Sequence, residues 1–194
     1  MKKRYLILGL FFFCVILNAQ SKDEREERVK LKDFPVKAQD VIRQLPNGYK
    51  RMRLYKETDG EKVSYEAKFK FKKQLVSLEF NTLGAIEDIE IEMTKKALKK
   101  QRELFKKIEN FLKSKGKKYK LIRIQEQYIF PGIDALPFLL SVLNKTYAEA
   151  INYELIVQVK TDKDWIFLET LFNESGELLI SRYIKPSSYG HILY

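Results

Sequence analysis

The sequence predicts an α+β protein made of two tandem repeats, each a helix followed by a four-stranded antiparallel sheet, with the two repeats packed together. Residues 65–84 run from a Tyr-Glu pair through two strands to the motif Phe-Asn-x-x-Gly, and residues 153–176 repeat this order. A pattern that returns in this way indicates a repeated supersecondary unit. Each copy is too short for a large core of its own, so we expect the copies to pack on each other.

The first 19 residues have the order of an export signal. Residues 2–4 are basic, residues 5–17 are apolar, and Ala19 provides a small residue for cleavage. A membrane anchor is the alternative, but a bilayer-spanning helix needs about 20 apolar residues, more than this run contains. We therefore expect a signal peptide over 1–19 and a mature protein that is periplasmic or secreted. The only cysteine, Cys14, lies in this segment, so the mature chain has neither disulfides nor thiol chemistry.

The first predicted repeat spans 20–94. Asp33 is a good helix N-cap, and an apolar stripe follows it until Pro46-Asn47-Gly48 ends the helix. Residues 63–71 alternate strictly between apolar and polar, which predicts a strand with one buried and one wet face. Further strands are expected over residues 50–56 and near residues 76–80 and 89–93, and together the four predict an antiparallel meander covered by the helix on its apolar side.

The second predicted repeat spans 95–194. Thr94 caps a longer helix that ends near Gly116, and an insertion over about residues 130–150 contains Asp134 as the cap of a short apolar helix. The expected strands are Tyr119–Gln125, Asn152–Lys160, Trp165–Phe172 and Leu178–Ile184.

Several of these motifs resemble a known family. Phe34-Pro35 begins the first helix, residues 65–69 read Tyr-x-Ala-x-Phe, and residues 78–84 read Leu-Glu-Phe-Asn-x-x-Gly. They resemble the PepSY-like domains of exported bacterial proteins, whose fold is similar to that of the beta-lactamase inhibitory protein. The resemblance covers about residues 33–93 and, in the second copy, mainly 151–184. It implies a periplasmic or secreted module that binds proteins, sometimes peptidases, and that has no catalytic residues to transfer.

The sequence shows no catalytic or cofactor-binding motif. His191 has no neighbouring metal-ligating residue, and there is no phosphate-binding loop or nucleophile elbow. The acidic run over residues 87–92 has a period of two, so we interpret it as the charged, solvated edge of a sheet rather than a calcium loop. We expect no cofactor, no metal and no enzymatic activity, although a hydrolase built from converging carboxylates stays open as an alternative.

Positive charge is concentrated in residues 95–120, which carry twelve Lys or Arg against Glu103 and Glu109. An anionic membrane surface or polysaccharide is therefore one expected partner, and a solvated helix face is the alternative. Nucleic acid is not expected, because an exported protein seldom meets it. The candidate residues for an anionic surface are Lys95, Lys96, Lys99, Lys100, Lys106 and Lys107.

The second sheet carries apolar side chains on both faces, whereas in the first sheet the face that points away from the helix is charged. Either the insertion or the other repeat covers this extra apolar face, or a protein partner of unknown identity binds there. The leading hypothesis is an exported, non-enzymatic binding module that engages a protein partner, with inhibition as one form of that activity. The candidate partner-binding residues are Trp165, Phe167, Leu171, Ile156 and Ile180.

Overall fold

The main feature of the computed structural model is a single ten-stranded sheet with the order β1-β10-β9-β8-β7-β6-β5-β4-β3-β2. The structure describes residues 21–22, 24–132, 134–146 and 150–184. All neighbouring strands pair antiparallel except β1 and β10, which are parallel. The strands are β1 (Ser21–Lys22), β2 (Glu24–Arg28), β3 (Lys50–Asp59), β4 (Lys62–Phe71), β5 (Gln74–Asn81), β6 (Ile86–Glu92), β7 (Lys118–Ile129), β8 (Asn152–Lys160), β9 (Trp165–Asn173) and β10 (Leu178–Ile184).

The prediction of two separate four-stranded sheets is wrong, because β6 pairs directly with β7. Five residue pairs join these strands, from Asp88 with Ile129 to Glu92 with Gln125. An unpaired strand edge exposes backbone N–H and C=O groups, and this pairing satisfies the edges that two separate sheets would leave open. The chain therefore forms one continuous sheet, of which β3–β6 are the first half and β7–β10 the second half.

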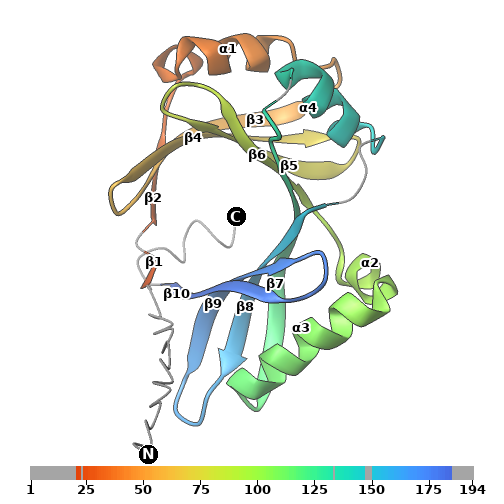
Figure 1. Cartoon of the computed structure of the whole chain (residues 1–194). Coiled ribbons are helices and arrows are strands. Elements are labelled where there is room, and N and C mark those ends of the chain that lie inside the picture. Colours follow the sequence, from red (N-terminus) through yellow and green to blue (C-terminus); the bar gives the residue numbers. More distant parts are fainter. Residues whose placement is uncertain (1–20, 23, 133, 147–149, 185–194) are drawn as a thin grey trace, which may run out of the picture.

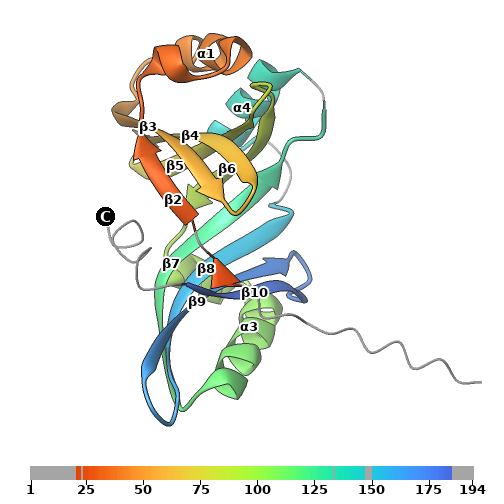
Figure 2. The same ribbon diagram turned by 90° about the vertical axis from the view of Figure 1, so that its left-hand side faces the viewer.

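The sheet curls until its two ends meet (Figure 1). Only one residue separates β1 from β2 in the sequence, yet β1 pairs with β10 and β2 pairs with β3, at opposite ends of the strand order. Figure 2 shows these two short strands on the side where the ends meet. An ion pair of 2.8 Å between Arg182 of β10 and Asp59 of β3 also spans the closure. The sheet thus encloses an inner face, and all the helices lie outside it.

The outer face of the first half forms one hydrophobic core with two helices. Phe34 and the buried side of α1 (Ala38 and Ile42) pack on Phe69, Leu78, Phe80 and their neighbours. Asp33 does not cap α1 as predicted, because its carboxylate accepts a hydrogen bond from the Lys30 N–H, and α1 begins after Pro35. The helices are η1 (Leu31–Asp33), α1 (Val36–Arg43), α2 (Lys95–Lys100), α3 (Arg102–Lys115) and α4 (Ala135–Leu143).

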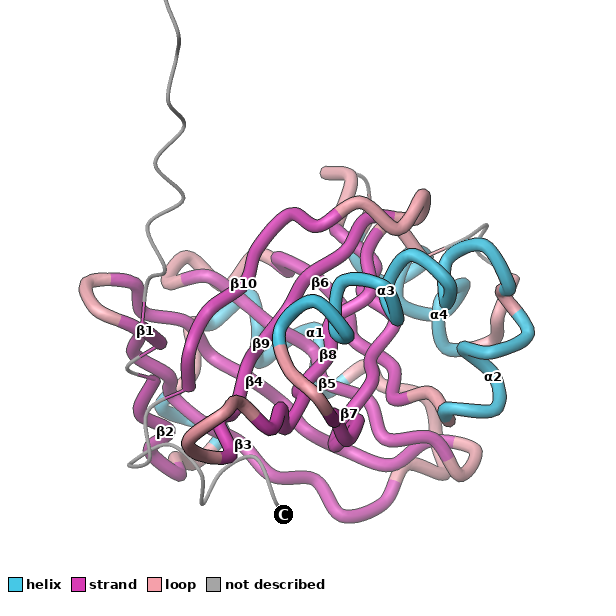
Figure 3. Tube along the Cα trace, turned by 90° about the horizontal axis from the view of Figure 1, so that it is seen from below, coloured by secondary structure: helices cyan, strands magenta, loops and turns pink. Residues whose placement is uncertain are grey.

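The outer face of the second half packs on α2 and α3, which lie side by side below it (Figure 3). Thr94 caps α2 as predicted, with its hydroxyl accepting a hydrogen bond from the Ala97 N–H. Ile108 and Leu112 of α3 are buried against Leu155 and Phe172. The apolar stripe of this helix therefore supplies a second core, separate from the first.

The insertion folds over the first half of the sheet, not over the second. Asp134 caps α4 as predicted, accepting a hydrogen bond from the Leu136 N–H at 3.3 Å. Phe138 and Leu139 are at most 1% exposed, and they belong to the core that contains α1. The expectation that this segment covers the apolar face around Trp165 is therefore wrong, because its apolar side chains fill the space beside α1 instead.

No helix in the described ranges is long and apolar enough to cross a membrane. The predicted signal peptide over 1–19 and His191 lie outside the described residues. Strands β8 and β10 have the predicted bounds, and β9 runs one residue further than predicted.

Candidate functional site: a polar interior and an apolar sheet edge

The polar face of the first half is buried inside the curled sheet. Ser64, Glu66, Ser77 and Glu90 are all less than 8% exposed. The sequence predicted this face to be wet and the acidic run over 87–92 to be a sheet edge, and both predictions are wrong. The physical reason is that β6 lies in the middle of the sheet and the second half closes over its inner side.

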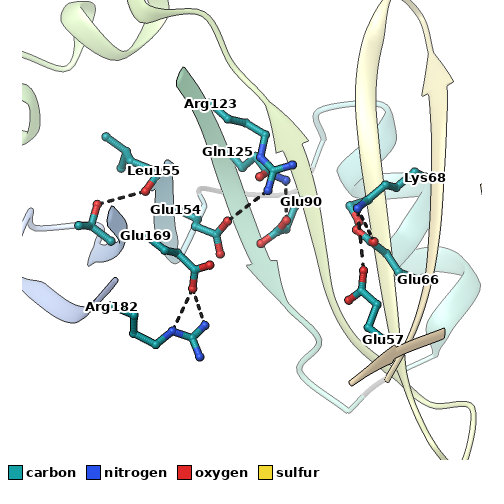
Figure 4. A network of polar contacts seen from close by, with 12 residues as sticks. Glu57, Glu66, Lys68, Glu90, Arg123, Gln125, Glu154, Leu155, Glu169 and Arg182 are labelled. Atoms are coloured by element: carbon teal, nitrogen blue, oxygen red, sulfur yellow. Dashed lines mark hydrogen bonds and ion pairs between the residues drawn. The ribbon is translucent and has the colours of Figure 1, made fainter. Parts of the chain in front are cut away.

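Three carboxylates of the interior share one lysine (Figure 4). The Lys68 ammonium lies 2.6 Å from Glu26, 2.7 Å from Glu66 and 3.9 Å from Glu57. These carboxylate oxygens are close enough together to hold a metal ion, and the ammonium supplies the positive charge there instead. Burial alone would lower the pKa of Lys68, but the surrounding carboxylates raise it well above its ordinary value, so the lysine stays charged.

The second half contributes its own polar groups to the same interior. The Gln125 side-chain amide donates a hydrogen bond to the Glu90 carboxylate, which joins β7 to β6. The Arg182 guanidinium donates to the Glu169 carboxylate as well as to Asp59. Figure 4 shows the Gln125–Glu90 and Arg182–Glu169 contacts in the interior between the two halves. Buried polar groups of this kind rigidify an interior only where they find partners, so the network fixes how the two halves face each other.

A cavity of about 250 Å³ at one end of this interior carries an excess of acid. Burial raises the pKa of Asp88 to about 7, against the opposing ammonium of Lys62 and with help from the neighbouring carboxylates. Burial and then the charge of Asp88 raise the pKa of Glu79, and burial and then Glu154 raise that of Glu90. The carboxylates and their two cations come from every strand of the two halves except β7, which contributes Gln127; they are Glu57, Asp59, Lys62, Glu79, Asp88, Glu90, Glu154, Glu169 and Arg182.

The predicted partner-binding residues do not form one patch. Trp165 is 44% exposed and Ile180 is 42% exposed, but Ile156 is only 1% exposed on the inner face. Phe167 and Leu171 are half-buried. Because Ile180 pairs with Leu171, six residues along β9 from Trp165, the two exposed side chains are roughly 20 Å apart along the sheet.

Three consecutive exposed apolar residues, here called the apolar row, lie instead along β10, and Ile180 among them also lines the acidic cavity. Leu178 is 37% exposed, Leu179 is 48% and Ile180 is 42%. Among the described residues, the edge of β10 that faces away from β9 pairs only with β1, at Tyr183 and Ile184. The sequence reasoning included Ile180 and missed the other two. Three consecutive apolar residues in a final strand were the available signal.

The six candidate lysines for an anionic surface are all exposed on α2 and α3. Lys107 donates a hydrogen bond to the Ser175 carbonyl at 2.8 Å, and Lys99 lies 5.6 Å from the Phe105 ring centroid. The helices present them on the outside of the second half, away from the interior (Figure 3).

Comparison with known proteins gives a fold but no family. No family model matches the chain, and no curated protein matches it. A protein from Bacteroides eggerthii, provisionally described as periplasmic, has a similar structure with a TM-score of 0.50, and so does a DUF2874 family protein from Bacteroides uniformis. Each is 12% identical to this chain, and the alignment covers 77% of this chain and 88% of the other.

At this identity the likeness shows a shared fold and nothing about ligands. The resemblance to PepSY-like domains and to the beta-lactamase inhibitory protein stays a prediction, whereas the predicted fold of two helix-plus-four-stranded repeats is wrong, because one sheet runs through both halves.

Proposed function

We propose that this protein is an exported, non-enzymatic binding module that engages a protein partner by strand addition at the free edge of β10. The observation that carries the proposal is the apolar row Leu178–Ile180. Among the described residues, no strand pairs with this part of β10 on the edge away from β9. An edge strand offers backbone N–H and C=O groups to an extended segment of another protein, and apolar side chains beside it add specificity.

The chain itself uses this edge for strand addition. Ser21 and Lys22 pair in parallel with Tyr183 and Ile184, at the far end of the same strand. A partner segment at Leu178–Ile180 extends the pairing of β10 that β1 begins. The export signal pattern of residues 1–19 and the provisional periplasmic description of the B. eggerthii protein support a partner in the periplasm or outside the cell.

The test compares two forms of the mature chain in affinity capture from an envelope extract. Leu179→Lys with Ile180→Lys adds charge at two exposed positions of the edge, which costs little stability and disfavours strand pairing. We expect the wild type to retain a protein that the double variant loses, and the purified pair to bind with the same difference. Lys30→Gln with Lys37→Gln, on the opposite half, is the control and should capture as the wild type does.

Equal capture by wild type and edge variant would contradict the proposal. Concentration-dependent self-association that the edge variant abolishes would identify a second copy of this chain as the partner, which light scattering distinguishes directly.

The anionic-surface alternative rests on a different observation, the exposure of the candidate lysines on α2 and α3. It needs no free sheet edge, so the edge variant leaves it unchanged. Binding to anionic vesicles, measured with variants of these lysines, tests it independently.

A further inference from the structure

A second cavity, of about 430 Å³, lies at the other end of the interior from the acidic one. Its lining residues on β4 are Lys68 and Lys70, whereas the acidic cavity uses Lys62 and Ser64 of the same strand. On β3, β5, β6 and β7, too, the two cavities are lined by residues at different positions along the strand. The two cavities therefore lie toward opposite ends of the strands. We call this second cavity the cationic pocket. It is lined by Arg51, Arg53, Lys68, Phe69, Lys70, Leu75, Val76, Ser77, Glu92, Ile122, Arg123 and Gln125.

Its charge is not neutralised within the protein. Lys68 is held by the carboxylates of Glu26 and Glu66, and Arg123 lies 4.0 Å from Glu154. The other three cations, Arg51, Arg53 and Lys70, make no hydrogen bond or ion pair with any described residue. Glu92 is the single carboxylate of the lining. In the part of the lining away from the Lys68 carboxylates, these three cations outnumber Glu92, and this local positive charge favours an anion.

The backbone is irregular at this pocket on both sides. The pairing of β3 with β4 slips between Lys50 and Arg53, and that of β7 with β8 slips between Leu121 and Arg123. Arg51 also has a φ of 58°, in the left-handed region that costs a non-glycine residue about 1–2 kcal/mol. Bulges redirect side chains and occur often beside binding sites, and local strain of this kind concentrates there as well. Both irregularities present arginine side chains to the same cavity.

The pocket also has apolar walls. Leu75 is 53% exposed beside it, and Ile122 is half-buried in the bulge of β7. Its volume falls within the roughly 300–1,000 Å³ of small-molecule sites, which combine apolar walls with a few polar groups that fix orientation. Guanidinium groups bind carboxylate, sulfate and phosphate oxygens through paired hydrogen bonds.

We propose that the cationic pocket binds a small amphiphilic anion, with its oxyanion head group on Arg51 and Arg53 and a short apolar tail against Leu75 and Ile122. This site is independent of the β10 edge, so either can fail without the other. Figure 4 shows the part of the interior that forms its inner end, where Lys68 of β4 and Arg123 and Gln125 of β7 lie.

Titration calorimetry on the mature protein tests the site with three probes. Decanoate below its micelle concentration supplies head and tail, decyltrimethylammonium keeps the tail and reverses the charge, and inorganic sulfate supplies an oxyanion without a tail. We expect decanoate to bind most tightly, sulfate weakly, and the ammonium compound not at all. Decanoate affinity should fall as ionic strength rises, because the contact is between charges.

Two variants locate the binding. Arg51→Gln with Arg53→Gln should weaken decanoate binding by about tenfold or more, because two charged hydrogen-bond donors are lost. Leu75→Asp, at an exposed position, should weaken it by placing a negative charge beside the anion. Lys37→Gln with Lys163→Gln removes the same charge from exposed positions away from the pocket and from the basic helices, and should leave the affinity unchanged.

Equal binding of decanoate and decyltrimethylammonium would overturn the proposal, since it would show binding of the tail alone. Unchanged affinity in the folded Arg51→Gln, Arg53→Gln variant would also overturn it, as would sulfate binding as tightly as decanoate. Amide chemical-shift changes on adding decanoate should centre on Leu75, Ser77 and Gln125, and changes confined to β10 would place the ligand elsewhere.

Discussion

At the scale of single residues, the most unusual groups are the acids of the interior. Asp88 has a folded-state pKa of about 7 against an ordinary value of 3.8, because it is buried near other carboxylates. The folded protein therefore holds a proton that the unfolded chain has already released between these two values. The stability that this carboxyl contributes is complete below its ordinary pKa and is lost as pH rises to about 7.

Asp88→Asn removes this charge while keeping an oxygen that can accept from the Gln127 amide, which lies 3.0 Å from Asp88. At pH 8 we expect the variant to have a free energy of unfolding higher than wild type by on the order of 1–2 kcal/mol, with the difference vanishing near pH 4. Denaturant unfolding at the two pH values measures it. Glu61→Gln, at an exposed position, is the control, and an Asp88→Asn effect equal at both pH values would contradict the shifted pKa.

Two glycines of the Phe-Asn-x-x-Gly motif allow the sheet to approach a helix. Gly84 has a φ of +79°, and a Cβ there would lie 2.8 Å from the Ala38 backbone nitrogen in α1. Gly176 has a φ of +81°, but its nearest neighbours are the side-chain atoms Cβ and Cδ of Lys107, which lie further away, at 3.1 Å. Both alanine variants meet the left-handed backbone penalty of about 1–2 kcal/mol, and only the first meets fixed backbone.

We therefore expect Gly84→Ala to lower the free energy of unfolding by about 2–4 kcal/mol and Gly176→Ala by about 1–2 kcal/mol. Thermal or denaturant unfolding of the two variants provides the comparison. A larger loss from Gly176→Ala would show that the contact with α1 is not the tighter one.

At the scale of elements, α2 and α3 present the basic surface. If these helices hold the protein on anionic membranes, sedimentation with vesicles that contain anionic lipid should decline steeply with added salt, since exposed charges are screened beyond about 10 Å at 0.1 M ionic strength. Replacing Lys95, Lys96, Lys99 and Lys100 with Gln should reduce binding. Replacing the exposed Lys30, Lys32, Lys37 and Lys163 removes equal charge elsewhere and should have less effect.

Equal loss from both sets would mean that net charge alone attracts the protein to the vesicle. Binding to neutral vesicles at the same strength would remove charge from the explanation.

Sequence patterns predicted single elements well and their assembly poorly. The bounds of β8 and β10 and the caps at Thr94 and Asp134 follow from local chemistry, since alternation and capping depend on neighbouring residues. The position of α4 does not, because an apolar helix packs equally well on any apolar face. Its choice of the core beside α1 depends on space that only the assembled sheet defines.

The burial of the polar face in the interior could not be predicted for a similar reason. The alternation in β4 predicted which face would meet the helices. The sequence pattern of a polar face, however, is the same whether water or another part of the protein lies opposite it. The second half contributes both polar residues, such as Gln125 and Gln127, and apolar residues, such as Ile156, to the interior, so its pattern did not show which surface lies opposite. The pairing register places Ile156, Trp165 and Ile180 on one face of the sheet. Ile156 is buried in β8, between β7 and β9, whereas Trp165 at the start of β9 and Ile180 in β10 reach the surface.

At the scale of the whole molecule, the buried carboxylates and both cavities depend on closure of the sheet. Closure buries the carboxylates, separates the acidic cavity from the cationic pocket and leaves the β10 edge beside β1. The two ends meet where Arg182 and Asp59 form their ion pair (Figure 1). Arginine and aspartate there are far apart in sequence, so their proximity reports the fold directly.

Cys14 is the only cysteine of the sequence, so a chain that begins at residue 20 allows this contact to be measured by cross-linking. In Asp59→Cys with Arg182→Cys, a short bismaleimide should join the two cysteines within one folded monomer and increase its mobility on a denaturing gel. In Asp59→Cys with Lys106→Cys the sheet lies between the two sites, and the same reagent should not join them. Efficient cross-linking at 59 and 182 alone is the result that closure predicts; no cross-link there, in a protein that is otherwise folded, would show that the sheet is open.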